Sequence, residues 1–241
     1  MKHLFALLAL LALAAPAAAQ TEFTSVRELG MGSAFAGGGN SNGAIFHNPA
    51  GIVTAAVYSF EAGYMYGAGN SSNSLGASIV DSKTNPNVAA GFGYSYTFSN
   101  GPTDSDADNI GDHNIRGALG FPIVPQVAAI GIGAHYITYN RGTTTNDEGD
   151  QVDVQFRALS LDVGLQAVAA RTVSFGIAAR NLLQPTEYVP PREIAGGIGV
   201  FVDALHFEAQ YLAREDKVAE VWDSGFGLGL EYTIANRKSV V

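Results

Sequence analysis

Large apolar residues alternate with small or polar residues along most of the chain. Within residues 88–98, for example, Phe92 and Tyr94 alternate with Gly93 and Ser95. Because successive side chains of a β-strand point to opposite faces, this period of two predicts a strand with one apolar face and one small, polar face. The same alternation recurs in residues 58–66, 114–121, 130–136, 160–166, 173–180, 205–211 and 225–232, and more weakly near 74–80 and 194–202. The sequence therefore predicts an all-β protein of about ten strands.

Long and short connections alternate between these predicted strands. The long ones are polar or rich in proline and lie at residues 99–112, 141–151, 182–191 and 215–223. The short ones lie at residues 121–125, 169–172, 203–204 and 234–236. Long loops at one end and short turns at the other are typical of an antiparallel transmembrane β-barrel, whereas a soluble β-sandwich has no reason to alternate them. We expect the barrel, with a soluble sandwich as the alternative.

The apolar phase shifts by one residue around Ala158 and Leu159. This shift predicts either a β-bulge or the point at which that strand leaves the membrane.

Residues 1–19 have the order of a signal peptide. A basic start at Lys2 and His3 precedes a run of leucine and alanine and an Ala-x-Ala site, which predicts cleavage after Ala19. The apolar run is shorter than the roughly 20 residues that a membrane-spanning helix needs. An exported chain without a spanning helix is periplasmic, secreted or an outer-membrane barrel, and the strand pattern favours the outer membrane of a Gram-negative bacterium.

The composition limits the partners that this chain can have. It contains no cysteine, so neither disulfide bonds nor thiol chemistry is expected. The formal net charge is −9 with only 13 Lys and Arg residues, which argues against nucleic acid as a partner. Outer-membrane lipid is the partner that the strand pattern predicts.

Several charged residues and a histidine share the small, polar face that would line the lumen of a barrel. These lumen residues are Glu61, Arg116, His135, Asp162, Arg180, Glu208 and Glu231. Charges of both signs in one lumen pair with each other and with any segment that fills it, and this is the simplest interpretation of each of them.

Residues 30–51 are rich in glycine and asparagine, yet apolar around Phe35 and Phe46. The runs GMGSAFAG, starting at Gly30, and HNPAG, ending at Gly51, resemble the N-terminal hatch of the FadL-like outer-membrane proteins, a superfamily of long-chain fatty-acid transporters that also contains PorV-type secretion proteins. In that superfamily the hatch plugs the barrel lumen. The resemblance implies a hatch at residues 20–55, a barrel at residues 56–241, and a gating role for Gly30, Gly32, Phe35, Phe46, Asn48, Pro49 and Gly51.

A second stretch resembles the PorV-type members of this superfamily. It consists of Arg180-Asn181-Leu182, then Pro185 and Pro190-Pro191-Arg192-Glu193. The resemblance implies a strand-loop-strand unit in which Arg180 faces the lumen. Both motifs identify the architecture better than the cargo.

The number of strands conflicts with a plug. A barrel of about ten strands is nearly filled by its own side chains, so residues 21–55 would not fit inside it. FadL-like barrels have fourteen strands, and residues 236–241 are neither aromatic nor convincingly a strand. We therefore expect that the C-terminus is truncated or degenerate and that closing strands are missing.

Other chemistry receives little support from the sequence. Asp104, Asp106 and Asp108 resemble the start of a calcium loop, but position six is Asn109 and no Glu stands at position twelve. A solvated acidic loop at residues 104–112 is the main interpretation, and weak Ca²⁺ binding is the alternative. No serine, histidine or carboxylate pair has informative spacing, so we expect no enzyme, catalytic residue, resident metal or cofactor.

Two functions remain for a plugged outer-membrane barrel. In the first, a hydrophobic small molecule of the fatty-acid or hydrocarbon type diffuses inward past the hatch, with Phe35, Ile45 and Phe46 guiding it. In the second, the barrel is a scaffold or shuttle that holds a protein of a secretion or surface-assembly system. A continuous apolar passage supports uptake, and a lumen sealed by Arg–Glu pairs supports the scaffold. The glycine-rich inward face favours an open passage, so uptake is the first expectation.

Overall fold

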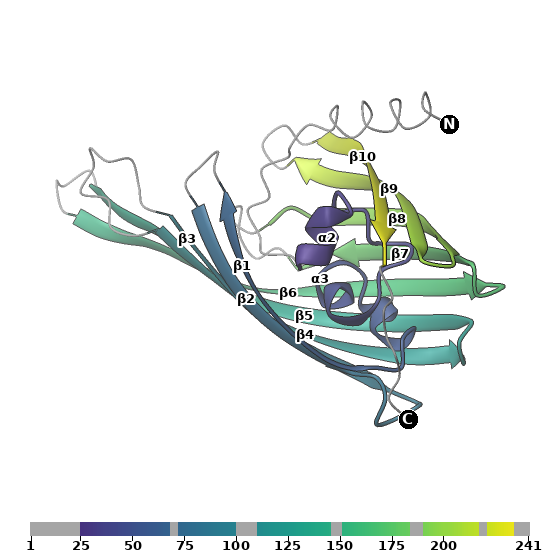
Figure 1. The fold of residues 1–241 in the computed structure, drawn as a ribbon. Coiled ribbons are helices and arrows are strands. Elements are labelled where there is room, and N and C mark those ends of the chain that lie inside the picture. Colours follow the sequence, from purple (N-terminus) through teal and green to yellow (C-terminus); the bar gives the residue numbers. More distant parts are fainter. Residues whose placement is uncertain are drawn as a thin grey trace.

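The computed structural model describes residues 25–67, 72–99, 110–145, 151–183, 190–216 and 221–233, in which ten strands form one antiparallel sheet (Figure 1). The strands are β1 (Tyr58–Gly67), β2 (Ser72–Asp81), β3 (Ala89–Ser99), β4 (Ile110–Val124), β5 (Ala128–Thr145), β6 (Gln151–Ala169), β7 (Val173–Arg180), β8 (Glu193–Val202), β9 (Leu205–Asp216) and β10 (Val221–Tyr232). The all-β prediction is confirmed, and the two weaker segments form β2 and β8. The predicted signal peptide at residues 1–19 lies outside the described residues.

Each strand pairs with the next one along the chain, which makes the sheet an up-and-down meander with β1 and β10 at its edges. Among the described strands these two edges do not pair with each other, so the sheet is not closed into a barrel. The barrel prediction is therefore met only as far as the antiparallel sheet. None of the described helices is long and apolar enough to cross a membrane.

The N-terminal segment lies inside the curve of the sheet (Figure 1). It forms the short helices α2 (Val26–Gly30), η1 (Ser41–Gly43), α3 (Ala44–His47) and η2 (Pro49–Val53). Residues 25–57 are called the plug below, and most of its side chains from Met31 to Ile52 are buried. The expected conflict between ten strands and a plug applies to a closed barrel, and here the sheet is open and curves around the plug. The expectation about the C-terminus concerns residues 236–241, which lie outside the described residues, and it stays a prediction.

The two faces of the sheet have inverted polarity. Large apolar side chains cover the outer face and are exposed, as in Phe60 (67%), Ile177 (60%) and Phe226 (84%). Polar side chains on the inner face are buried against the plug, as in Arg116 (3%) and Glu208 (0%). The predicted assignment of residues to the two faces is confirmed in the eight strands with clear alternation, because it follows from the period of two alone.

The connections differ from the prediction at several places. The predicted link at residues 121–125 is mostly part of β4, which ends at Val124, and both β9 and β10 reach into the predicted loop at residues 215–223. The short turns at residues 125–127, 170–172 and 203–204 lie at one end of the sheet. At the other end, most of the predicted polar loop at residues 141–151 continues β5 and β6, which reach Thr145 and begin again at Gln151. Polar residues were taken for a loop there, although a strand outside an apolar environment also carries polar residues on both faces.

The register of the sheet shows where it is irregular and how far its strands are staggered. Register shifts occur at Pro122/Val124 and at Asn140/Thr143, and the β5–β6 register runs without a break past Ala158 and Leu159. Of the two alternatives for those residues, the β-bulge was wrong, and exit of the strand from the membrane stays a prediction. Following paired residues from Tyr58 across all strands leads to Ser224, eight residues before β10 ends at Tyr232.

Candidate functional site

The plug is built from short helical turns that its own sequence specifies. Ser25 and Glu28 form a capping box, in which the Ser25 N–H donates to Glu28 Oε2 over 2.8 Å. Asn48 caps η2, because its Oδ1 accepts the Ala50 N–H over 3.2 Å and Pro49 begins the helix. Each helix is too short to be stable alone, so the sheet must hold the plug in place.

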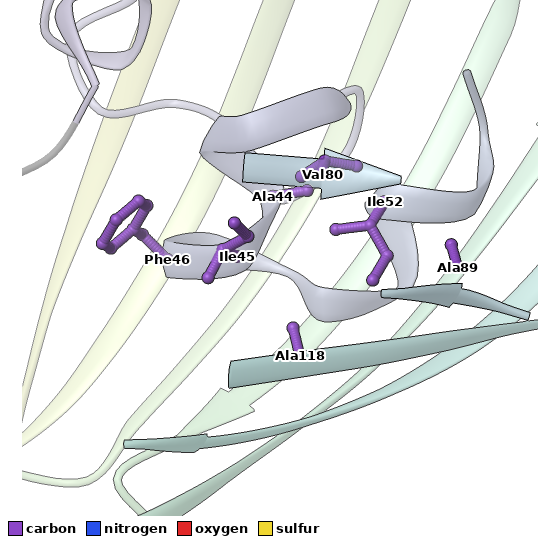
Figure 2. Close-up of a cluster of buried hydrophobic side chains, with 7 residues drawn as sticks. All are labelled: Ala44, Ile45, Phe46, Ile52, Val80, Ala89 and Ala118. Atoms are coloured by element: carbon purple, nitrogen blue, oxygen red, sulfur yellow. The ribbon is translucent and has the colours of Figure 1, made fainter. Parts of the chain in front are cut away.

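Apolar contacts join the plug to β2, β3 and β4. Ile45, Phe46 and Ile52 of the plug are at most 4% exposed. They form a cluster with Ala44 of the plug and with Val80, Ala89 and Ala118 of the sheet (Figure 2). Burying each large side chain stabilises this contact by about 1.5–3 kcal/mol. These packing contacts have no fixed direction.

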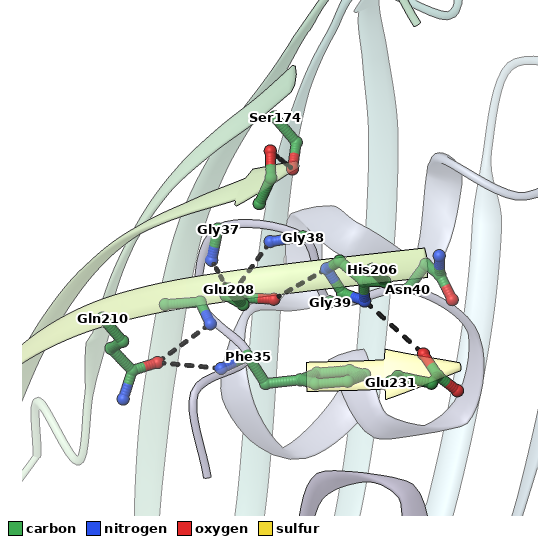
Figure 3. Close-up of polar contacts among 12 residues, drawn as sticks. Phe35, Gly37, Gly38, Gly39, Asn40, Ser174, His206, Glu208, Gln210 and Glu231 are labelled. Carbon is green, nitrogen blue, oxygen red and sulfur yellow. Dashed lines mark hydrogen bonds and ion pairs between the residues drawn. The ribbon is translucent and has the colours of Figure 1, made fainter. Parts of the chain in front are cut away.

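Hydrogen bonds join the plug to β9 on the opposite side. Gln210 Oε1 accepts the N–H groups of Phe35 and Ala36 over 3.1 and 2.9 Å. Glu208 Oε1 accepts those of Gly37 and Gly38 over 2.7 and 3.0 Å (Figure 3). Two side chains on one face of β9 thus satisfy a row of backbone donors that the plug does not satisfy itself, and the charged acceptor makes the stronger bonds.

Asn48 and Gln166 fix the plug over the middle of the sheet. Asn48 Nδ2 donates to Ala36 O within the plug over 2.8 Å and to Leu165 O of β6 over 3.1 Å. Gln166 Nε2 donates to Gly37 O over 2.9 Å. Asn48 is fully buried. Without its side chain these buried carbonyl groups would lose a donor, which costs about 1–3 kcal/mol.

Glycines of the sheet allow the plug backbone to come this close. A Cβ atom at Gly176 would lie 1.9 Å from Ala36 O, and one at Gly164 would lie 2.0 Å from Asn48 Oδ1. At Gly131 it would lie 2.2 Å from Ala50 N. The inward glycines were expected to leave an open passage, but at these positions they receive the plug.

One group of charges joins β4, β5 and β6 beneath the plug. Asp162 Oδ2 lies 3.6 Å from Arg116 Nη1 and 3.2 Å from His135 Nδ1. Asp162 Oδ1 accepts the Asn181 N–H over 2.8 Å. Each of these side chains is at least 95% buried, so their charges are held by one another rather than by water.

Two arginines of this region also hold the plug. Phe46 O accepts hydrogen bonds from Arg180 Nη1 over 3.2 Å and from Arg116 Nη1 over 3.5 Å. The Arg116 guanidinium also lies 5.6 Å from the Phe46 ring centroid. Arg180 pairs with Glu193 on β8, and Arg214 of β9 pairs with the same carboxylate.

A second group of charges joins the plug to β10. Arg27 forms a bidentate pair with Glu231, because Nε lies 3.0 Å from both carboxylate oxygens and Nη2 lies 2.9 Å from Oε2. His206 lies between Glu231 and Glu208, with Nδ1 3.5 Å from the first and Nε2 3.3 Å from the second (Figure 3). Arg27 also lies over the ring of Phe35, 5.1 Å from its centroid. β10 is an edge strand, so these contacts fix the plug to an edge of the sheet.

The structure places the predicted lumen residues together on the inner face. Glu61 is half-buried on β1, and the others take part in the contacts above. Of the predicted hatch residues, Phe35, Phe46, Asn48, Pro49 and Gly51 are buried against the sheet. Gly32 has φ +59° and lies against Leu228 O of β10, whereas Gly30 is exposed and a Cβ there would meet nothing within 4 Å.

Several residues that hold the plug were not singled out in the sequence. Glu28 is fully buried with its Oε2 3.3 Å from His47 Nε2, and Asn42 Nδ2 donates to Ser78 Oγ over 3.0 Å. Gln166 and Gln210 lie within two of the segments predicted as strands, and neither was given a role. The alternation places both residues on the inner face, and their amide groups can donate and accept hydrogen bonds. Their partners are backbone atoms far along the chain, however, and periodicity does not reveal these.

The acidic run at residues 104–108 lies outside the described residues. Within the part of the chain that the structure does describe, no three His, Asp or Glu side chains are grouped as a metal site requires. No family model matches the chain, and no curated protein matches it either.

Proposed function

We propose that this protein resides in the outer membrane, where its strands form the lipid-facing wall of a barrel around a fixed plug. Its inverted polarity supports this location. A water-soluble protein would have to leave a belt of Phe, Tyr, Ile and Leu on its outer face in contact with water, while burying Arg116, Asp162 and Glu208. In a bilayer the apolar outer face contacts lipid and the polar inner face contacts the plug, so the arrangement is favourable on both faces.

The stagger of the strands supports the same location. The residue of β10 that is in register with Tyr58 of β1 is Ser224, which lies eight residues before the end of β10 at Tyr232. The strands are therefore offset by eight residues between β1 and β10. With about 3.3 Å per residue and about 4.8 Å between strands, this corresponds to a tilt of about 30°, near the range of closed barrels. This proposal includes further strands that close the barrel between β1 and β10.

We propose a scaffold as the role of this barrel, with a protein of a secretion or surface-assembly system as its partner. The observation that carries this role is the attachment of the plug. Backbone atoms of residues 35–39 are held by Glu208, Gln210 and Gln166, and the inner glycines touch the plug directly. A segment held at so many points is suited to support the wall rather than to move at each transport cycle.

Uptake of a hydrophobic small molecule is the second candidate. The observation that favours it is the apolar contact of Ile45, Phe46 and Ile52 with β2–β4. Packing contacts reform in many arrangements, so this side is where a fatty acid or hydrocarbon would pass if the plug moved.

A disulfide that locks the plug distinguishes the two roles. A Cβ atom at Gly227 would lie 3.4 Å from Ala34 Cβ, close to the separation in disulfides, and the chain has no other cysteine. We expect A34C/G227C, oxidised in the outer membrane, to retain full association with its protein partners and to take up no more radiolabelled oleate than an empty membrane, before and after reduction.

The single variants A34C and G227C are the controls for this experiment. Oleate uptake that is present in the reduced protein and lost on oxidation would refute the scaffold and establish the second candidate. Loss of partner association on oxidation would also count against a fixed plug.

A further inference from the structure

We infer that a phosphate group of lipopolysaccharide binds to the outer face of β4–β6, between His113 and Arg157. Together with Thr138, these residues are called the phosphate row. β4, β5 and β6 are neighbours in the sheet (Figure 1), and their register aligns the row, with His113 opposite Thr138 and Thr138 opposite Arg157. The inference rests on the proposed function, because it requires that the outer face of these strands contacts the lipid of the outer membrane.

The phosphate row lies at one boundary of an apolar band on the outer face. Eight residues farther along the three strands, a second register row consists of large apolar side chains, Phe121, Ile130 and Leu165. The outer-face residues between the two rows carry no charge, and on β6 they are Leu159, Leu161 and Val163. At about 3.3 Å per residue and a tilt of about 30°, eight residues span about 23 Å across the membrane, close to the apolar band of about 25 Å in outer-membrane barrels. The phosphate row therefore lies at the depth of the lipid headgroups.

The phosphate row also lies near the end of the sheet that has the long connections. Residues 100–109 join β3 to β4 at that end, and residues 181–192 join β7 to β8, whereas the turns at residues 125–127 and 170–172 lie at the opposite end. In outer-membrane barrels the long loops face the outside of the cell and the short turns face the periplasm. The headgroups beside the row are therefore those of the outer leaflet, where lipopolysaccharide carries its phosphate groups.

Two tyrosines of β3 hold the ring of His113. Its Nδ1 lies 2.8 Å from the Tyr94 hydroxyl oxygen, and the ring stacks on that of Tyr96 with centroids 4.5 Å apart. Because Nδ1 is engaged, Nε2 is the ring nitrogen that remains for a ligand. An anion beside Nε2 favours the forms of the imidazole that carry a hydrogen there. A ring held in this way loses little conformational freedom when it binds a phosphate.

Arg157 provides the positive charge of the phosphate row. Its side chain is exposed, and no described side chain forms an ion pair with it. The described outer-face side chains of β3–β6 also include no Asp or Glu, so no carboxylate repels an anion there. The planar guanidinium group binds phosphate through two parallel hydrogen bonds, and it is favoured for this reason in phosphate recognition. The charge and the depth of Arg157 thus both suit the phosphate of a lipid.

The spacing of the phosphate row suits a single phosphate group. Neighbouring strands are about 4.8 Å apart, so the backbones at His113 and Arg157 are about 10 Å apart. Thr138 is short and lies between them, so both longer side chains can reach an anion that sits above it. The Thr138 hydroxyl group adds a third donor.

Another exposed arginine differs from Arg157 in its partner. Arg192, just before β8, forms a bidentate pair with Glu215 of β9, with Nε 2.9 Å from Oε2 and Nη2 2.9 Å from Oε1. Its charge is already neutralised within the protein, so it gains less from a phosphate. Arg192 therefore provides a matched control for Arg157.

Native mass spectrometry of the full protein in detergent micelles tests this inference. The probe is lipid A with both of its phosphates, and the same lipid with both phosphates removed is its control. We expect about one probe molecule bound per chain and at least tenfold weaker binding of the control lipid. R157Q should weaken probe binding at least fivefold, and H113F, which retains a ring beside Tyr96, at least threefold. R192Q should change probe binding less than twofold.

Heat-modifiable migration in gels checks that each variant is folded. Equal affinity of the wild type, R157Q and H113F for the probe would overturn the inference, and so would equal affinity for the lipid without phosphates. Phosphatidylglycerol bound as tightly as the probe would overturn it in favour of phospholipid phosphate. Failed binding of the probe by a protein that still resides in the outer membrane would reject this inference and leave the proposed location intact.

Discussion

Single glycines decide how closely the plug approaches the sheet. At Gly176 a side chain would overlap Ala36 O at 1.9 Å, whereas at Gly225 on β10 a Cβ would meet nothing within 4 Å. The residue type is the same and both lie in strands, so the difference comes from the plug alone. This contrast provides a matched pair of substitutions.

We expect G176A to destabilise the folded protein by about 1–3 kcal/mol, because the plug or the strand must shift to admit the methyl group. G225A should change the free energy of unfolding by less than about 0.5 kcal/mol. Urea unfolding in detergent micelles, followed by tryptophan fluorescence, measures both. Equal effects of the two substitutions would mean that strand propensity, and not contact with the plug, sets the cost.

Among the elements, the plug packs through an apolar cluster at one side and is bound through a row of its backbone N–H groups at the other. Its α3 and η2 helices pack on β2–β4, and residues 35–38 hydrogen-bond to β9. Hydrogen bonds act at defined atoms, so their removal should free defined segments of the plug rather than all of it.

We expect E208A to increase hydrogen exchange at the Gly37 and Gly38 amides about 10- to 100-fold, because a bond to a charged acceptor contributes about 1.5–3 kcal/mol. Q210A should affect the Phe35 and Ala36 amides instead. Exchange measured by mass spectrometry with short overlapping peptides separates the two pairs. Faster exchange over the whole plug in both variants would show that the plug is released as a unit, contrary to this expectation.

The ion pair of Arg27 and Glu231 should contribute less to the free energy of unfolding than the hydrogen bonds of Glu208. Both side chains are more than a quarter exposed, so water screens their interaction. A double-mutant cycle with R27A and E231A should give a coupling free energy of about 0.5–1 kcal/mol. A coupling above about 2 kcal/mol would indicate that this pair is shielded from water in the membrane.

For the whole molecule, the inverted polarity predicts which surface tolerates charge. Ile132 on β5 and Val127 in the adjacent turn are almost equally exposed, at 48% and 50%. In water, arginine at either position would be nearly neutral. In the proposed bilayer, Ile132 lies on the lipid-facing wall and Val127 at the end of the barrel.

We expect I132R to reduce the free energy of unfolding in lipid vesicles by about 2–4 kcal/mol and to lower the amount assembled in outer membranes. V127R should have little effect on either. Denaturant titration in vesicles and fractionation of cells provide the two measurements. Similar behaviour of both variants in vesicles would argue that the outer face of β5 does not contact lipid.

Much of the fold follows from the sequence because its cause is local. The alternation around Phe92 and Gly93 requires only that neighbouring side chains of a strand point apart, and it placed residues as distant as Glu61 and Glu231 on the same face. The prediction was wrong where a pattern has two causes, as at residues 141–145, where polar residues extend β5 instead of forming a loop.

The sequence by itself determined the existence of the ten strands and the two faces of those with clear alternation, since these depend on residues within a few positions of one another. Only the tertiary structure decided that the sheet stays open, that Gly164 and Gly176 receive the plug, and that Arg27 meets Glu231 across 204 positions of sequence. Such contacts depend on the curvature and stagger of the whole sheet. A period of two fixes the face on which a side chain lies, but it carries no information about which distant atom will lie opposite.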